Sequence, residues 1–231
     1  GETAENVAQK WNITREQQEQ FAYESHIKSS KAVSDGNFSD ELIEINSDSA
    51  SVSDDGCIRF EPSIEAMSGL RPVFSDSGTV TAATSSPLTD GATALIVCSE
   101  EFASSHGLQP LVRIVSGTAT GCKPELMGMG PVSATRKVLE NANWEIDSVD
   151  LFEINEAFSS QSLAVISELG IDIGRVNIDG GAISIGHPLG ASGARITGKA
   201  ASLLNRTGGK RAIATMCIGG GMGMAMALEK I

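Results

Sequence analysis

The feature that most constrains the fold is the alternation of strand-like and helix-like runs after residue 110. Elements that alternate in this way build a sheet covered by helices on both faces, so we expect an α/β fold with a mixed sheet. The last two strands are joined by a glycine turn, which implies an antiparallel finish. The predicted strands are 111–116, 149–154, 211–217 and 222–229, and the predicted helices are 132–141, 158–169 and 192–204.

The first 85 residues follow a different pattern. Residues 2–11 and 15–35 predict two helices, and Thr14 with Gln17 three residues later forms a capping-box signature before the second helix. The second helix is polar with a thin apolar stripe, so we expect it to lie on a surface. Residues 37–85 are rich in Ser, Asp, Gly and Pro and predict a long loop region with short strands. We expect this loop region to be ordered and to have a function.

The composition changes again near residue 86. Residues 92–97 are largely apolar and favour a buried strand, and residues 99–106 favour a helix. This pattern divides the chain into residues 1–85, 86–108 and 109–231.

Charge and cysteine spacing exclude several classes of function. The net charge is −12 and the 17 Lys and Arg residues are scattered, which argues against a nucleic acid partner. No apolar run reaches membrane-spanning length, so no membrane association is expected. The four cysteines and three histidines lack the spacing of a metal site or a disulfide framework. A reducing compartment, the cytoplasm by default, is expected, and no metal is predicted.

His187 lies between Gly186 and Pro188 in a segment that is rich in glycine. Glycines let the backbone approach a ligand closely and expose N–H groups, so we favour a functional histidine over a structural one held in a tight turn. The glycine spacing from Gly181 to Gly186 matches a phosphate-binding loop. His187 and Pro188, however, replace the Lys and Ser/Thr that such a loop needs, so that interpretation fails.

Cys217 ends a predicted strand, and four of the next six residues are glycine. A thiol at this position is expected to be partly exposed near backbone donors, which favours the thiolate. The alternative is a small buried hydrophobic residue, which fits Cys98 better because Cys98 follows an apolar run. The glycine spacing after Cys217 is not a dinucleotide fingerprint, because a strand follows it instead of a helix.

Asn155 and Glu156 follow another predicted strand. Taken alone, they read best as a helix cap followed by an acidic residue in the first turn. Ligands of open α/β sheets bind where strands run out into loops, so these residues, His187 and Cys217 could instead converge at one end of the sheet.

Together these segments resemble the thiolase family. The resemblance extends over essentially the whole chain and is carried by several specific motifs. These are Thr3-Ala4-Glu5-Asn6, Gly78-Thr79-Val80-Thr81-Ala82, Asp90-Gly91-Ala92, Met127-Gly128-Met129-Gly130-Pro131, Asn155-Glu156-Ala157-Phe158, the run from Gly180 to Arg195, and Cys217 to Gly223.

The resemblance implies an acyl-CoA C-acyltransferase that joins or splits 3-ketoacyl-CoA and acetyl-CoA. It gives Cys217 the role of acid and base on the α-carbon, and His187 the roles of nucleophile activator and oxyanion donor. It makes Asn155 the holder of a water in the same oxyanion hole and Gly219 a backbone donor of a second one. No cofactor is implied, because the CoA thioesters are substrates. The implied substrate contacts are Arg59, Phe74, Ala82, Ser86, Met127, Ala157 and Phe158.

The resemblance also implies a thiolase-like C-terminal half-domain (109–231), a CoA-binding loop domain (1–85) and a strand–helix piece of the N-terminal domain (86–108). None of the four cysteines fits the family's upstream nucleophile. We therefore expect a chain that lacks the N-terminal nucleophile domain, is inactive alone and needs that domain or a partner chain. The full-length enzyme is expected to be a homo-oligomer.

Three alternatives stay open. The chain could be a non-catalytic, CoA-binding thiolase-like fragment, because the nucleophile is absent. A papain-like triad of Cys217, His187 and Asn155 has little weight, because the order along the chain is reversed. Within the family, the motifs fit acetoacetyl-CoA enzymes and degradative 3-ketoacyl-CoA thiolases equally well, so acyl-chain length stays undecided.

Overall fold

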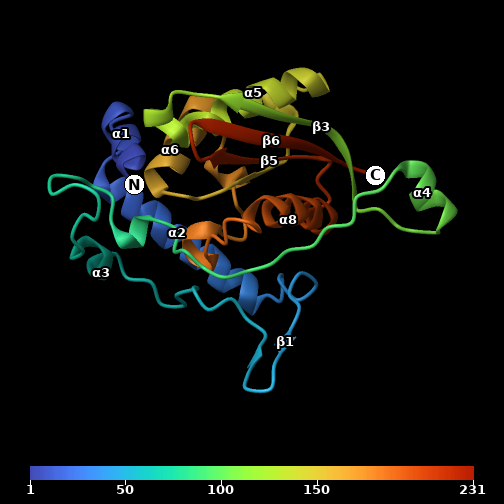
Figure 1. The fold of residues 1–231 in the computed structure, drawn as a ribbon, viewed down its shortest axis with the longest axis horizontal. Helices are drawn as coiled ribbons and strands as arrows, with labels where there is room; N and C mark the ends of the chain where they lie inside the picture. Colours follow the sequence, from blue (N-terminus) through green and yellow to red (C-terminus); the bar gives the residue numbers. More distant parts are fainter.

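The computed structural model describes residues 1–231, and its centre is a four-stranded sheet in the order β3-β6-β5-β4. The strands are β3 (Val112–Gly121), β4 (Leu151–Ile154), β5 (Arg211–Ile218) and β6 (Met222–Lys230). β6 pairs antiparallel with both β3 and β5, whereas β4 pairs parallel with β5. A parallel pair needs a long crossover, and the chain between β4 and β5 supplies it (Figure 1). The predicted antiparallel finish is confirmed.

Helices cover both faces of this sheet (Figure 1). α5 (Gly130–Ala142) and α6 (Ser159–Leu169) belong to one core, and α8 (Ser192–Thr207) belongs to the other. Successive residues of β4 alternate between the cores, because side chains of a strand point to opposite faces. Phe152 and Ile154 pack with α5 and α6, whereas Leu151 packs with α8. The predicted α/β fold with a mixed, helix-covered sheet is confirmed.

Two helices open the chain, α1 (Glu2–Lys10) and α2 (Arg15–Ser34). The predicted capping box is present, with Thr14 and Gln17 bonded reciprocally at 3.3 and 2.8 Å. α2 has one exposed face, as expected, but its buried face is not only the thin apolar stripe, because the polar residues Ser25 and Ser29 are buried too. They pack against the turn at Gly180, where an added Cβ would lie 2.0 Å from Ser29 Oγ. Hydrogen bonds to buried partners therefore allow polar residues of α2 to lie on its buried face.

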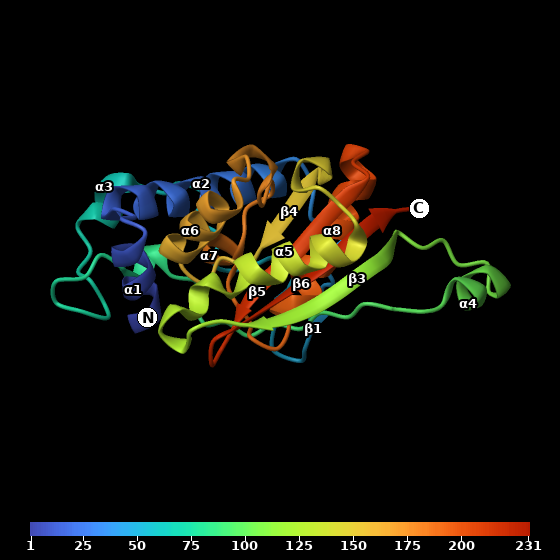
Figure 2. The same ribbon diagram turned by 90° about the horizontal axis from the view of Figure 1, so that it is seen from above.

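Residues 35–111 contain little regular structure, as predicted for the loop region. The expected strand at 92–97 is absent, and Ile96 is 91% exposed. No neighbouring strand offers this segment backbone partners, so its apolar character alone does not make it a strand. Figures 1 and 2 show α4 standing away from the sheet beyond this stretch. The short elements here are β1 (Ile45–Asn46), β2 (Ser51–Val52), α3 (Ile64–Ser68), η1 (Ala82–Thr84) and α4 (Glu100–Ser105).

The remaining connections of the sheet are short helical turns. They are η2 (Pro124–Met129), η3 (Ile146–Ser148), η4 (Ile173–Arg175) and α7 (Ala182–Ile185). None of the helices combines the length and the apolar character that a bilayer crossing requires.

Candidate active site

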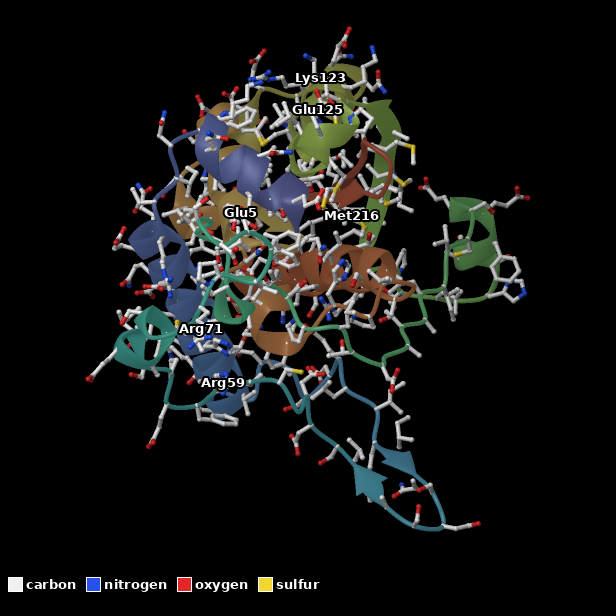
Figure 3. The ribbon with its side chains drawn as sticks, turned by 60° about the vertical axis from the view of Figure 1, so that its left-hand side comes forward. Glu5, Arg59, Arg71, Lys123, Glu125 and Met216 are labelled. Carbon is white, nitrogen blue, oxygen red and sulfur yellow. The ribbon has the colours of Figure 1, made fainter.

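The carboxyl ends of β4 and β5 meet at one edge of the sheet, because the two strands run parallel. Asn155 follows β4 directly, and its backbone N–H donates to Thr215 O of β5 at 3.0 Å. Cys217 lies two residues further along β5. Met216, labelled in Figure 3, precedes Cys217 and faces α8, where a Cβ added to Gly193 would lie 3.5 Å from its sulfur. Two of the predicted segments therefore end side by side.

The structure brings His187 into contact with Asn155. His187 Nε2 lies 3.2 Å from Asn155 Nδ2, and its other ring nitrogen, Nδ1, lies 2.5 Å from Ser192 Oγ. The backbone N–H of His187 donates to Pro87 O at 3.0 Å, which ties the turn to the segment after η1. Burial, with the nearby Arg195 guanidinium, lowers the pKa of His187. The resting imidazole is therefore neutral near pH 7.

Ser192 lies within the glycine-rich run from Gly180 to Arg195 but was not among the predicted site residues. The available signal was a hydroxyl five residues after His187 in the same glycine-rich segment, at the predicted start of a helix. Whether such a hydroxyl reaches the ring depends on the turn between them, which sequence spacing does not determine.

Cys217 is buried, in contrast to the partly exposed thiolate expected from its sequence. Burial raises the pKa of the Cys217 thiol to about 11. The side chain is therefore a protonated thiol at neutral pH, because removing water penalises the charged form more than nearby dipoles stabilise it. A thiol of this kind holds a proton that it can deliver to a carbanion, and it becomes a base when that proton is removed.

Gly219 begins the turn between β5 and β6. A Cβ added to Gly219 would meet no atom within 4 Å, so the space beside its backbone is open. Gly220 and Gly221 follow with φ of 88° and 91°, a left-handed conformation that favours glycine. The glycines therefore have a conformational role in this turn and leave open space beside Gly219.

Glu156 is a buried acceptor and does not act as a first-turn acid, because α6 begins only at Ser159 and Phe158 occupies the cap position. Its carboxylate accepts hydrogen bonds from Ser25 Oγ, Asn177 Nδ2 and the Ile183 N–H at 2.7, 2.8 and 3.2 Å. Burial raises the pKa of Glu156, and the bonds from Asn177 and Ser25 oppose that rise. The cap interpretation is wrong, and Glu156 instead fastens the turn that leads to His187.

Five of the predicted CoA contacts lie on neighbouring segments. Phe74 and Phe158 pack edge to face with ring centroids 5.9 Å apart. Ser86 donates to Ala157 O through both its backbone N–H, at 3.0 Å, and its hydroxyl, at 3.1 Å. Ala82 begins the short helix η1 just upstream of Ser86.

Arg59 and Met127 are held in other parts of the structure. The Arg59 backbone N–H donates to His26 Nδ1 of α2 at 3.2 Å. Met127 belongs to η2, and its carbonyl lies 3.8 Å from Cys122 Sγ. Figure 3 shows Arg59 and Arg71 well apart from Lys123 and Glu125, the residues that flank the start of η2. The predicted substrate contacts therefore extend across the molecule.

Glu153 is a buried carboxyl on the α8 side of β4, and its Oε1 has no hydrogen-bond partner. Burial raises the pKa of Glu153 to about 8, although Lys199 opposes that rise. Between about pH 4.5 and about pH 8 the folded protein therefore keeps a proton that the unfolded chain has lost. This contribution to stability is complete below that window and is lost as the pH rises through it.

We expect Glu153→Gln to flatten this pH dependence, because glutamine mimics the neutral acid. Between about pH 6 and about pH 8 the wild-type free energy of unfolding should fall by about 2 kcal/mol more than that of the variant. Urea denaturation at both pH values measures the difference. Parallel profiles for the two proteins would show that Glu153 is already ionised in the folded state.

Comparison with known protein families gives two matches. Residues 108–230 match the C-terminal domain of thiolase, and residues 1–101 match the N-terminal domain of thiolase. The chain belongs to the thiolase family.

Curated relatives and solved structures agree with this assignment. The acetyl-CoA acetyltransferase of Shinella zoogloeoides is 47% identical, over 100% of this chain and 60% of the relative. The cytosolic acetyl-CoA acetyltransferase of Rattus norvegicus is 43% identical, over 100% of this chain and 59% of the relative. The Bacillus anthracis acetyl-CoA acetyltransferase structure is 43% identical with a TM-score of 0.96, over 100% and 60%. Human mitochondrial 3-ketoacyl-CoA thiolase in complex with CoA is 42% identical with a TM-score of 0.97, over 99% and 58%.

These matches correct one prediction. The expectation that the N-terminal domain is lacking is wrong, because residues 1–101 match the family's N-terminal domain. The chain spans about 60% of the length of the curated relatives it matches. The finer division into residues 1–85, 86–108 and 109–231 and the assigned roles of the site residues stay predictions.

Proposed function

We propose that the protein is an acyl-CoA C-acyltransferase that forms or cleaves the carbon–carbon bond of a 3-ketoacyl-CoA. The observation that carries the proposal is the His187–Asn155 pair, whose nitrogens lie 3.2 Å apart beside the strand that carries Cys217. Family membership supports the same reaction class, and relatives are named acetyl-CoA acetyltransferase.

The proposed chemistry follows from the three side chains. Removing a proton from the carbon next to a thioester needs a base and donors for the enolate oxygen. Cys217 carries the proton to and from that carbon. Once Nε2 has taken a proton, it lies with the Asn155 amide where the two can stabilise the oxygen. The Gly219 N–H serves the tetrahedral intermediate of acyl transfer. No metal or other cofactor is needed for these steps.

Coenzyme A thioesters are the proposed substrates. Phe74, Ser86, Ala157 and Phe158 are joined by direct contacts or chain neighbours next to Asn155, and we assign this group to the pantetheine arm of a CoA thioester. Relatives are named both for acetyl-CoA and for 3-ketoacyl-CoA. The preferred acyl-chain length of the substrate can be measured with a series that compares acetoacetyl-CoA with longer 3-ketoacyl-CoA thioesters.

The test is a thiolysis assay on acetoacetyl-CoA. We expect the chain to be inactive alone and active when joined to the part of the Shinella zoogloeoides relative that the match leaves uncovered. We also propose that the complete protein is a cytoplasmic homo-oligomer. CoA binding without thiolysis, and without deuterium exchange at the acetyl-CoA methyl, in the joined protein would instead favour the non-catalytic alternative.

A further inference from the structure

The hydroxyl of Ser192 is fully buried at the first residue of α8, and it touches the imidazole of His187. Its Oγ has two neighbours, His187 Nδ1 at 2.5 Å and Pro188 O at 3.0 Å. The backbone N–H of Ser192 also donates to Pro188 O, at 2.9 Å. Side chain and backbone therefore fix this hydroxyl against the ring.

The location of the ring proton follows from the donors around it. Asn155 presents its amide nitrogen to Nε2 at 3.2 Å, and an amide nitrogen only donates. Nε2 is therefore the acceptor, and the proton of the neutral imidazole lies on Nδ1. Ser192 Oγ accepts the hydrogen bond from Nδ1–H and donates its own hydrogen to Pro188 O, because a carbonyl oxygen only accepts.

The reverse orientation of the Asn155 amide is less favourable. In the orientation present, one buried acceptor, Oδ1, has no partner. Turning the amide would put an NH₂ group with two donors at that same position. Leaving buried donors unpaired costs desolvation free energy for each, so the orientation with one orphan acceptor is preferred.

We propose that Ser192 is a positioning residue that keeps the proton of His187 on Nδ1 and so presents Nε2 to the active site as the base. The catalytic use of Nε2 rests on the proposed acyltransferase function, whereas the tautomer itself does not. In the proposed step Nε2 takes the proton of a thiol, which leaves a thiolate and an imidazolium. Nε2 later returns that proton to the departing thiolate, and the Nδ1–H···Oγ bond stays unchanged throughout.

A hydroxyl suits this role better than a carboxylate would. A carboxylate against Nδ1 would hold the imidazolium permanently, because opposite charges favour the charged form. Ser192 orients the ring and accepts its proton without adding charge. This agrees with the direction of the His187 pKa, which burial lowers. The imidazole is thus free to take a proton during the reaction.

The tautomer can be measured by ¹⁵N NMR on the complete protein labelled at histidine. Only His26, His106 and His187 contribute signals in this part of the protein, and single His→Asn replacements assign them. We expect His187 to carry its proton on Nδ1 in the wild-type protein. A wild-type proton on Nε2 would overturn the proposal without any variant at Ser192.

The variant Ser192→Ala removes the acceptor of the Nδ1 proton and should shift the tautomer population toward Nε2, even though the Asn155 amide still lies against Nε2. Ser192→Thr, which keeps a hydroxyl, should leave the proton on Nδ1. The matched control is Ser160→Ala, which also removes a fully buried hydroxyl but one that donates to Ala4 O at 3.1 Å. It should leave the His187 tautomer unchanged. An unchanged tautomer in Ser192→Ala would overturn the proposal.

Kinetics separate this proposal from the proposed function. In the active enzyme, Ser192→Ala should slow acyl transfer about 10²-fold and shift its pH profile, with KM for the acyl-CoA almost unchanged. Wild-type rates and pH profile in that variant would reject the role of Ser192 alone. Absence of thiolysis in the wild-type protein would reject the proposed function, while the NMR result would still decide the tautomer.

Discussion

Replacing Cys217 with alanine is expected to slow deuterium exchange at the methyl group of acetyl-CoA by about 10²–10⁴-fold in the complete protein. The exchange needs a group that removes a proton from carbon and returns one from solvent. Cys217 is a buried thiol, and burial raises its pKa to about 11. Alanine keeps the small size but has no proton to exchange. Cys217→Ser should fail as well, because a hydroxyl is a far weaker acid than a thiol.

The matched control is Cys98→Ala, which removes an exposed thiol and should leave the exchange rate unchanged. The raised pKa of Cys217 also sets the sign of the pH dependence. The thiolate fraction increases as the pH rises toward about 11, so wild-type exchange should accelerate between about pH 7 and about pH 9. NMR of the acetyl methyl signal measures both effects. Exchange that persists in Cys217→Ala would assign the carbon base to another group.

The strands of the sheet could be predicted because each apolar run finds partners within the chain. β5 and β6 were expected from their apolar runs and their glycine turn, and they pair as expected. Residues 92–97 have a similar composition but no neighbouring strand, so they stay exposed. Strand formation depends on hydrogen-bond partners that composition does not reveal.

The buried polar residues of α2 illustrate a second limit of prediction from sequence. Ser25 and Ser29 are buried because Glu156, Ser184 and Asp179 O, from residues more than a hundred positions away, accept or share their hydrogen bonds. A periodicity argument places polar residues outside, since it carries no information about such distant partners.

The candidate active site also has features that the sequence predicts and features that only packing determines. Glycine-rich turns at strand ends identified His187 and Cys217 as candidates, because local backbone chemistry is visible in the sequence. The burial of Cys217 and the contact of Ser192 with the imidazole depend on how the elements pack. Local sequence therefore indicates which residues can carry chemistry, whereas packing determines their protonation.

Asp179→Ala is expected to destabilise the folded protein by about 3–5 kcal/mol. Asp179 is buried, and its carboxylate bridges two cations of α8. It lies 2.6 Å from Lys199 Nζ and receives both terminal nitrogens of Arg206 at 2.6 and 2.7 Å. The side chain of Lys199 is only 7% exposed, so removal of Asp179 leaves a buried ammonium group with Glu41 as its remaining ion-pair partner. The loss arises because Glu41 alone compensates the desolvation of that charge less completely than Glu41 and Asp179 together.

The control for this prediction is Glu140→Ala, which removes an ion pair with Lys137 at the surface. Exposed pairs contribute little, so its free energy of unfolding should change by less than about 1 kcal/mol. Urea denaturation measures both variants. Equal effects for the two would show that burial adds nothing to the Asp179 cluster.

The cluster also predicts a loss of stability at low pH. Burial alone would raise the pKa of Asp179, but the hydrogen bonds from Arg206 and Lys199 outweigh it and hold that pKa below its ordinary value. The stabilisation is therefore complete above the ordinary pKa of an aspartate and is lost as the pH falls through the lowered one. Glu153, with its raised pKa, loses stability in the opposite direction, as the pH rises. The protein should therefore be most stable between the two titrations. Asp179→Ala should remove the acid limb and also weaken the alkaline one, because the Asp179 charge helps to raise the pKa of Glu153.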